Sequence, residues 1–540
     1  MNNKKMTILT TLILIIVLIV VISPLIKAQT AINDQIRNTL RILSANKNTD
    51  LIIDSPYFLN EITNSYERND FKPYWFEDSF NESAMQLKDV LVNIEKEGLN
   101  PKLYKVEFLK KFFNKEDLSL EEKAIADIFL TNSFYLLTSH FSNGVLEPEN
   151  LEEEWLSVKK ELKVKEYLEK AIQKQDVKNS LYSLIPQNER YSKLKDKLKL
   201  LNEIKNDGGW TKVETTQNLK PGMSGESIRK LKIRLKQSRD FNGEIDEEYD
   251  DELEKSVINF QKRYGLTPDG IAGPNTFKAL NRDIKELIKI VEINLERLRW
   301  LPKTYEDNYI FTNIADFTLQ VYENKEKALE MSVIVGKEQR STPVFSSKLS
   351  YIVLNPYWTV PRSIAVEDKL PLIKKDIDYI PKNNFTVFKF IAGKIVEQNY
   401  KEINWEDLNK NNFNYFLRQD PGPSNALGRV KFMFPNKFSV YLHDTPNKEL
   451  FSQTERDFSS GCIRLEEPFK LAEYLLQKNN NWDLKKINDI LETNKETTVH
   501  LTQKLPIHIV YMTAWVNEQG ELQIRNDIYS RDKRLISAFY

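Results

Sequence analysis

Cysteine is nearly absent from this 540-residue chain, which has one, Cys462, and only four histidines. A single thiol cannot form a disulfide within the chain, so no disulfide framework stabilises the fold. Net charge is also lacking, because 78 basic side chains balance 78 acidic ones. This balance gives no global electrostatic reason to bind nucleic acid. Length and composition, with 41% hydrophobic and 29% charged residues, predict a soluble multidomain protein of three or four domains.

One long hydrophobic run is present, from residue 6 to residue 26, directly after two lysines. Its length of about 21 residues is that of a membrane-spanning helix. The residues that follow make a poor signal-peptide cleavage site, which favours a retained anchor at residues 1–28 over a removed signal. We therefore predict an extracytoplasmic, periplasmic protein that this helix holds in the inner membrane. Exported proteins commonly pair their cysteines, so an unpaired one either joins another chain or is reactive.

Helical periodicity dominates the next part of the chain. Residues 30–206 contain few glycines and several amphipathic stretches, for example residues 84–94, which predict an α-helical scaffold domain. Residues 284–300 carry another apolar helical face, and Pro302 closes it. We expect this connecting segment, residues 283–303, to pack back on the scaffold.

A compact unit at residues 217–282 follows a turn-prone Asn-Asp-Gly-Gly sequence. It contains Phe260-Gln261 within a helical pattern, a Gly265-Leu266 step and the turn Asp269-Gly270-Ile271-Ala272-Gly273-Pro274-Asn275-Thr276. These elements closely resemble the small three-helix peptidoglycan-binding domain, with its phenylalanine-glutamine helix and DGxxGxxT turn. The resemblance implies binding of peptidoglycan glycan or stem peptides. The alternative is a helical spacer that no longer binds, because a fold signature is not itself a binding site.

Beyond residue 306 the helical period gives way to alternating apolar and polar residues, which predicts a β-rich domain over residues 306–530. The predicted strands cover residues 309–314, 317–322, 329–335, 349–354, 438–443, 506–516 and 521–525. The polar stretch of about residues 363–428 interrupts this pattern and is predicted to form a helical lid over the site. The predicted fold class is therefore multidomain α+β.

The residues that could carry chemistry gather around Cys462. A thiol near its ordinary pKa is mostly protonated at neutral pH, so a cysteine nucleophile needs a neighbouring base or cation. His443 ends a predicted strand of the same domain and is the candidate general base. The backbone amides of Ser460 and Gly461, with that of Cys462, are candidates to stabilise an oxyanion.

Two further side chains of the same motif have candidate roles. Ser459 is expected to shape the loop or to orient His443. Arg464 could bind a substrate carboxylate through its planar fork. Its alternative role is a loop-bracing ion pair with Glu466 or Glu467.

The whole segment resembles the L,D-transpeptidase catalytic domain (YkuD-type), which has a cysteine nucleophile in an S-(H)-G-C-x-[RN] motif and an upstream histidine. Ser460 stands where many members carry histidine. The order of parts resembles the large periplasmic branch of this family, with its helical scaffold and peptidoglycan-binding domain. The matching pieces are Val335-Gly336, Ser341-Thr342-Pro343, residues 355–361, residues 419–428, Phe434-Pro435-Asn436, His443-Asp444-Thr445-Pro446 and residues 459–464.

The resemblance implies a peptidoglycan L,D-transpeptidase. In that reaction Cys462 attacks the third residue of a tetrapeptide stem, D-Ala leaves, and an amine of another stem resolves the thioester into a 3-3 cross-link. No metal or organic cofactor is expected. Tyr357, Trp358 and Tyr415 are expected to line the cleft, or to be core residues.

The implied partners are stem peptides and glycan, the membrane through the N-terminal helix and other cell-wall synthesis enzymes. Two alternatives stay open. One is a wall-bound L,D-carboxypeptidase or amidohydrolase that uses the same Cys and His with water as acceptor. The other is a non-catalytic peptidoglycan-binding scaffold.

Overall fold

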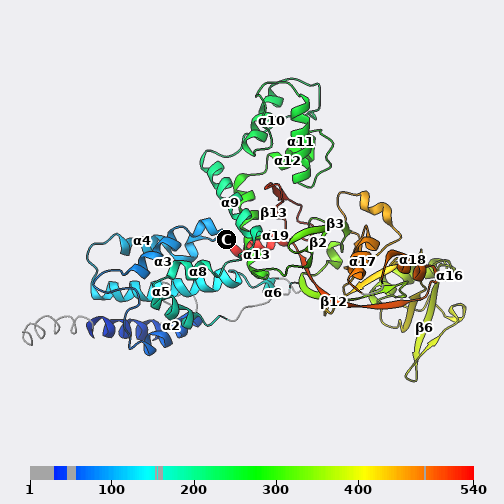
Figure 1. The fold of residues 1–540 in the computed structure, drawn as a ribbon, viewed down its shortest axis with the longest axis horizontal. Helices are drawn as coiled ribbons and strands as arrows, with labels where there is room; N and C mark the ends of the chain where they lie inside the picture. The colour runs from blue at the N-terminus through cyan, green and yellow to red at the C-terminus, as the bar shows by residue number, and fades with distance from the viewer. Residues whose placement is uncertain (1–29, 46–55, 152–154, 156–161, 480–481) are drawn as a thin grey trace, which may run out of the picture.

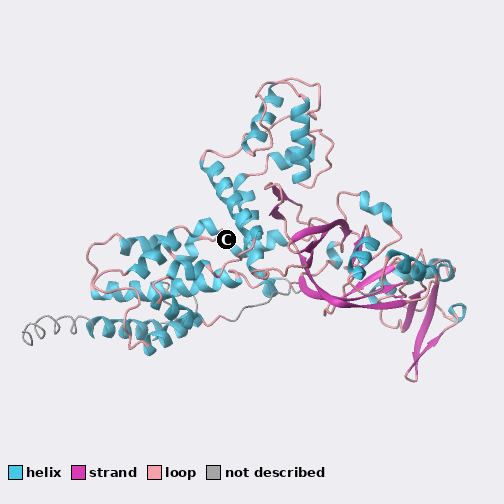
Figure 2. Ribbon diagram, in the orientation of Figure 1, coloured by secondary structure: helices cyan, strands magenta, loops and turns pink. Residues whose placement is uncertain are grey.

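The computed structural model describes residues 30–45, 56–151, 155, 162–479 and 482–540. Three parts meet at one junction: a helical region, a small three-helix unit and a β-rich domain (Figures 1 and 2). The predicted multidomain α+β architecture is thereby confirmed. The predicted membrane helix at residues 1–28 lies outside the described residues. Within the described part, no helix is both long and apolar enough to cross a membrane.

The helical region centres on the long helix α5, which a capping box of Ser119 and Glu122 begins. Asp127 of this helix is buried and accepts hydrogen bonds from the Tyr66 hydroxyl (2.5 Å) and from the amides of Tyr74 (3.0 Å) and Trp75 (2.8 Å). Burial raises the pKa of Asp127 to about 6. The aromatic segment around Trp75 is therefore core that an internal carboxylate fixes in place. The helices are α2 (Pro56–Arg68), α3 (Glu82–Val92), α4 (Val106–Phe113), α5 (Leu120–Asn143), α6 (Pro148–Leu151), α7 (Val164–Gln173), α8 (Val177–Tyr182) and α9 (Glu189–Asn206).

The three-helix unit consists of α10 (Glu226–Gln237), α11 (Asp251–Arg263) and α12 (Pro274–Leu280). The side-chain amide of Gln261 donates to Asp269 Oδ1 (2.8 Å) and to the Ile271 carbonyl (3.0 Å), and its oxygen accepts from the Gly270 amide (3.0 Å). Gly270 has a φ of +72°, a conformation that favours glycine. The glutamine and the turn motif therefore hold each other in place.

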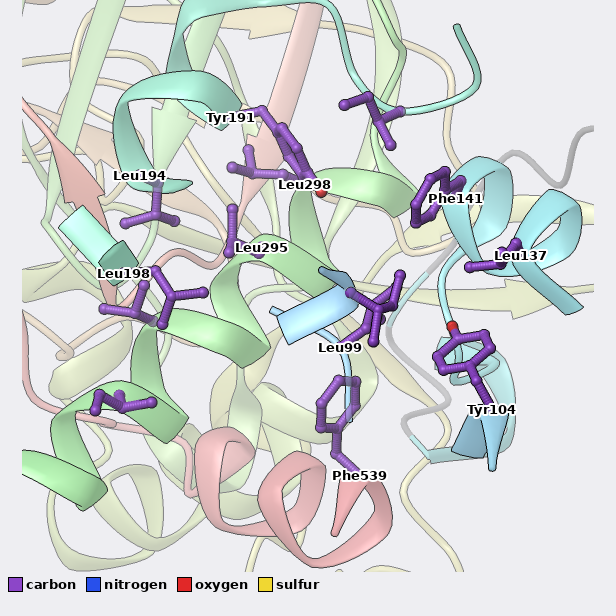
Figure 3. Close-up of a cluster of buried hydrophobic side chains, with 14 of the residues drawn as sticks. Leu99, Tyr104, Leu137, Phe141, Tyr191, Leu194, Leu198, Leu295, Leu298 and Phe539 are labelled. Carbon is purple, nitrogen blue, oxygen red and sulfur yellow. The ribbon is translucent and has the colours of Figure 1, made fainter. Parts of the chain in front are cut away.

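Helix α13 (Ile284–Trp300) joins the three parts and packs against α9, α5 and the C-terminal helix α19 (Arg531–Phe539). Apolar side chains from all of these elements meet in one cluster at the junction (Figure 3). A buried ion pair between Glu296 and Arg299 (2.9 Å) lies within α13, and Glu296 also accepts from the Val145 and Leu146 amides (2.5 and 2.8 Å). This pairing compensates two charges that would otherwise be costly to bury.

The β-rich domain is built on a closed eight-stranded barrel, in the order β1-β12-β4-β9-β10-β11-β3-β2. Apolar residues at alternate strand positions, such as Phe432, Leu442 and Ile463, point inward and form its core. Helices α17 (Pro468–Gln477) and α18 (Leu484–Glu492) pack against the barrel strands. The strands are β1 (Tyr309–Asn313), β2 (Thr318–Glu323), β3 (Glu326–Ile334), β4 (Phe345–Leu354), β9 (Val430–Met433), β10 (Leu442–His443), β11 (Ile463–Leu465) and β12 (Thr497–Val510).

The prediction of a helical lid at residues 363–428 is only partly right. The segment contains the short helices α14 (Arg362–Ile364), α15 (Leu370–Lys375) and α16 (Tyr379–Lys382). It also contributes most of a four-stranded sheet in the order β5-β8-β6-β7, formed by Trp358–Thr359, Tyr415–Gln419, Phe385–Ile391 and Lys394–Glu397. The sheet has its own small core, while the many Lys, Asn and Asp residues lie in turns and on exposed faces. Those polar residues hid the strand alternation in the sequence.

Two other predicted strands differ from the structure. The predicted strand 438–443 is reduced to Leu442–His443, because the Asn436 side chain accepts from the amides of Phe438 and Val440 (both 3.0 Å) and bends the chain before it. The predicted strand 506–516 ends as part of β12 at Val510. The Thr513 amide then donates to Asn294 Oδ1 (3.0 Å), which turns the chain toward α13.

After this turn, β13 (Ala514–Val516) and β14 (Leu522–Ile524) form a separate hairpin that contacts the three-helix unit. The Arg263 guanidinium donates to the Leu522 carbonyl (2.5 Å), and Arg525 donates to the Arg263 carbonyl (2.8 Å). Asn259 adds a hydrogen bond to Glu521 (3.0 Å). The three-helix unit is thus docked on the β-rich domain through this C-terminal hairpin.

Candidate active site

Three neighbouring barrel strands bring a row of basic side chains together. His443 on β10 lies directly opposite Lys431 on β9 and Arg464 on β11. Their neighbours in sequence point into the barrel core, so this row faces outward. Cys462 lies two residues before Arg464 and Tyr441 two residues before His443, which places both on the same outer face. The strand register therefore assembles the site that the sequence motifs predicted around Cys462 and His443.

Cys462 is a free, half-buried thiol. Tyr441 lies beside its sulfur, and both its hydroxyl and its main chain influence the thiol. Burial raises the pKa of the Cys462 thiol above its ordinary value, while the Tyr441 hydrogen bonds and the positive charges of Lys431 and Arg464 oppose that rise. The resting nucleophile is consequently a protonated thiol at neutral pH.

His443 is buried at the end of β10, and its Nδ1–H donates to the Asp444 carbonyl at 2.5 Å. A carbonyl can only accept, so this bond fixes the tautomer and leaves Nε2 as a proton acceptor. Burial lowers the pKa of His443 to about 3, assisted by the charges of Arg464 and Lys431 and opposed by backbone hydrogen bonds to Asp444 and Leu427. The imidazole is therefore neutral at pH 7.

A protonated thiol beside a neutral imidazole has a measurable consequence. The iodoacetamide alkylation rate of Cys462 is expected to rise with pH and to reach half its plateau at a pH above that of an ordinary cysteine, about 8.5. The sign follows from the raised thiol pKa, because less thiolate is present at any given neutral pH. The urea-denatured chain is the control and should titrate at the ordinary value. An alkylation rate that has already reached its plateau at pH 7 would contradict a protonated thiol beside a neutral imidazole.

The loop before Cys462 is held by its own side chains. The Ser459 hydroxyl donates to the Cys462 carbonyl (2.5 Å) and accepts from the Gly461 amide (3.1 Å). Ser459 thus braces the loop, and among the described contacts it has none with His443. The Gly461 amide, a predicted oxyanion donor, already donates to Ser459 Oγ in the structure. The amides of Ser460 and Cys462 carry no hydrogen bond within the described structure and remain as the two candidate donors.

A second loop, residues 336–342, supports the first. Thr342 Oγ1 donates to the Gly461 carbonyl (3.0 Å) and accepts from the Gly336 amide (2.9 Å), and the Tyr529 hydroxyl donates to the Gly336 carbonyl (2.5 Å). A Cβ at Gly336 would lie 2.1 Å from the Arg340 carbonyl, so only glycine fits. Gly336 and Thr342 belong to matching motif pieces, but their supporting role was not predicted.

Arg340 links this second loop to the lid. Its guanidinium binds both carboxylate oxygens of Asp368 (2.6 and 3.1 Å), one oxygen of Glu367 (2.5 Å) and the Ser460 hydroxyl (3.0 Å). Glu367 and Asp368 lie in a single π-helical turn of the lid, residues 365–369. No sequence pattern indicated this contact, because its partners are separated by about 30 to 120 positions and pair only in the fold.

The Arg464 side chain is half-buried, and its Nε has no hydrogen-bond partner in the described structure. Among the residues that the structure describes, Arg464 forms no ion pair with Glu466 or Glu467, the alternative role considered for it. Glu467 instead pairs with Lys470 (2.5 Å), and Glu466 accepts from the Ser332 amide (3.2 Å). A buried guanidinium edge without a partner favours an anionic ligand.

The three predicted cleft aromatics are not brought to the site by any described contact. Trp358 is buried in the core of the lid sheet, against Phe385. Tyr415 packs against the same core, while Tyr357 is exposed beneath the Arg418 guanidinium (4.6 Å). No three metal-ligating side chains cluster anywhere in the described ranges.

Comparison with protein families accounts for the three parts. Residues 307–499 match the L,D-transpeptidase catalytic domain, residues 60–198 a scaffold domain and residues 224–280 a putative peptidoglycan binding domain. The predicted resemblance to the L,D-transpeptidase catalytic domain is thereby confirmed for residues 307–499.

Two curated relatives show where the similarity lies. A putative L,D-transpeptidase of Haemophilus influenzae is 40% identical over 243 residues, which are 45% of this chain and 48% of that protein. A probable N-acetylmuramoyl-L-alanine amidase of Bacillus licheniformis is 42% identical over 65 residues, 12% of this chain and 18% of that protein. The chain thus spans about half the length of the first relative and under a fifth of the second.

Solved structures that match include an L,D-transpeptidase from Stackebrandtia nassauensis and one from Mycobacterium smegmatis. The first is 12% identical with a TM-score of 0.21, over 56% of this chain and 96% of that one. The second is 14% identical with a TM-score of 0.18, over 38% of this chain and 58% of that one.

Proposed function

We propose that this protein is a peptidoglycan L,D-transpeptidase that forms 3-3 cross-links through a thioester on Cys462. One observation carries the proposal: a half-buried thiol, a neutral His443 with a free acceptor nitrogen and an unpaired Arg464 share one face of the barrel. The match of residues 307–499 to the catalytic domain supports the reaction class. The match of residues 224–280 supports peptidoglycan as the partner.

Acylation of the enzyme is the first half of the reaction. Cys462 Sγ attacks the carbonyl carbon of the third stem residue while its proton passes to His443 Nε2. The Ser460 and Cys462 amides stabilise the developing oxyanion. The C–N bond then breaks, the nitrogen of D-Ala takes the proton from His443, and a thioester remains on Cys462.

Transfer to the acceptor is the second half. A side-chain amine of another stem attacks the thioester carbon and gives up a proton to His443, which returns it to the departing sulfur. Ser459 and Thr342 keep the loop in place through both halves, because they bind the carbonyls on either side of the attacking thiol. Arg464 binds a carboxylate of the donor stem.

The wall-acting domains support an extracytoplasmic location. The finer assignment is that residues 1–28 anchor the protein in the inner membrane, with stem peptides and glycan as partners of the region beyond. A carbonate wash of the membrane fraction offers a test. A chain that keeps residues 1–28 as an anchor stays with the membranes, and a chain cleaved after them is released.

The test of function is mass spectrometry of tetrapeptide muropeptides incubated with the full chain in detergent micelles, beside a Cys462→Ala control. We expect a cross-linked dimer that has lost one D-Ala, and none in the control. Trimmed monomers without dimer would instead assign an L,D-carboxypeptidase, since water would be the acceptor. No product from the intact chain would leave only the scaffold function.

A further inference from the structure

Lys431 is a second unpaired cation on the active-site face. It lies directly opposite His443 on β9, whereas Arg464 lies opposite His443 on β11. Neighbouring strands are about 4.8 Å apart, so the two cations stand roughly 10 Å apart at their backbones with His443 midway. In the described structure neither of them forms an ion pair.

The surroundings of Lys431 are set by Tyr441. The Lys431 ammonium lies 4.0 Å from the centroid of the Tyr441 ring, and Tyr441 and Lys431 both act on the Cys462 thiol, lowering its pKa against the effect of burial. Glu496 is a nearby acidic group but is exposed, and its carboxylate accepts from the Tyr357 amide (2.9 Å). Arg429, the basic residue directly before β9, donates a hydrogen bond from its Nε to Asn355 Oδ1 (2.9 Å). Lys431 is thus the available cation beyond His443.

The order of groups across the strands sets a direction for the donor. Cys462 immediately precedes β11, which carries Arg464; His443 is on the next strand, and Lys431 is one strand further on. Because His443 must protonate the departing nitrogen, the leaving amino acid lies toward His443 and away from β11. Its carboxylate, two bonds from that nitrogen, then points toward Lys431. The acyl part of the donor stays beside Arg464.

We infer that Lys431 and Arg464 select a donor with two carboxylates, Lys431 binding the one on the leaving amino acid and Arg464 one on the acyl side. This inference rests on the proposed function and deepens it. Lys431 becomes a specificity-determining residue for the leaving group. An amide in place of that carboxylate cannot pair with the ammonium, which leaves a half-buried cation without a counter-charge.

The test compares two donors, an acyl tetrapeptide that ends in D-alanine and the same peptide that ends in D-alaninamide. Thioester formation on the full chain is followed by intact mass, for the wild type, for Lys431→Met and for Lys437→Met. Methionine keeps the length of the lysine stem without its charge. Lys437 is the matched control, because it is a lysine in the turn after β9 whose ammonium lies over the Phe438 ring (5.2 Å).

We expect the wild type and Lys437→Met to prefer the free carboxylate by at least about tenfold in kcat/KM, the worth of one charge-assisted hydrogen bond. Lys431→Met should lower kcat/KM by that factor for the D-alanine donor alone, so that the variant reacts equally well with the two donors. Arg464→Met should keep the preference but lose discrimination when the acyl-side carboxylate is amidated. Iodoacetamide labelling of each variant confirms an accessible Cys462.

Three results would overturn the inference. Equal wild-type rates on both donors would show that the enzyme does not recognise the carboxylate of the leaving amino acid. An equal loss on both donors in Lys431→Met would make Lys431 a group that acts on the thiol. No loss at all would remove Lys431 from the site. Absence of any wild-type thioester overturns the proposed function as well, and so is distinct from these results.

Discussion

Replacing His443 with glutamine is expected to slow thioester formation at pH 7 by about 10²- to 10⁴-fold, the usual contribution of a positioned general base. The effect is large because burial raises the pKa of the Cys462 thiol, so almost no thiolate exists without a proton acceptor. Glutamine fills a similar space but cannot take the proton. The measurement is the rate at which the acyl-enzyme mass appears with a tetrapeptide donor.

The pH dependence of this variant separates a base from a structural residue. Without His443 the rate should keep rising with pH as the thiol ionises by itself, and the deficit should shrink toward pH 10. His500→Gln is the matched control, since His500 is an exposed histidine on β12 of the same barrel. A deficit that stayed constant across the pH range would assign His443 to packing instead.

Replacing Arg340 with glutamine should lower the acylation rate by about 10²-fold, comparable to the loss of one oxyanion donor. Arg340 binds the Ser460 hydroxyl while Glu367 and Asp368 of the lid hold its guanidinium. Its loss releases the loop that carries the Ser460 amide and leaves two carboxylates of the lid facing each other. Arg340→Lys should be intermediate, because an ammonium keeps the charge but cannot bind both oxygens of Asp368.

Two readouts distinguish a positioning role from general damage. Iodoacetamide should label Cys462 in Arg340→Gln at least as fast as in the wild type, because the thiol stays in place while the lid loosens. Lys382→Gln is the control, since it breaks an exposed ion pair within the same lid, Lys382 with Asp376 (2.9 Å). If Lys382→Gln lost as much activity as Arg340→Gln, the loss would reflect general damage to the lid and not the contacts of Arg340.

The same network has a defined response to pH. The hydrogen bond from Arg340 holds the pKa of Asp368 below its usual value. A lowered carboxyl pKa means that the contact contributes fully above about pH 4 and is lost as the pH falls further. The contact between Arg340 and Asp368 is therefore insensitive to pH in the neutral range, and we expect a loss of activity on mild acidification to come from another group.

Local patterns predicted much of this molecule. The apolar face of residues 284–300 coincides with α13, and the motif around Cys462 and the upstream His443 do meet on one barrel face. Both rest on information that is contiguous in the sequence: a helical period in one case, two short motifs in the other. The lid sheet was missed because its polar turns and exposed faces resemble a loop.

The residues that the sequence did not reveal are those that reach the site from other strands. Lys431 on β9 and Tyr441, just before β10, have no distinguishing sequence pattern until the register of β9, β10 and β11 brings them beside the nucleophile. Arg340 becomes relevant only when the lid folds over it. The bond between the Gly461 amide and the Ser459 hydroxyl was hidden for a related reason, since only the folded loop brings the two groups together. Strand register and loop closure are non-local, and a single sequence contains no direct record of them.

The docking of the three-helix unit on the β13–β14 hairpin fixes the distance between that unit and the catalytic site. Arg263 and Arg525 each bind a backbone carbonyl of the opposite partner, so the two domains cannot swing apart without breaking both contacts. A wall strand held by the three-helix unit would lie at a constant offset from Cys462. Under the proposed function, cross-links would then form at a spacing set by this docking, rather than at any position within reach of a flexible linker.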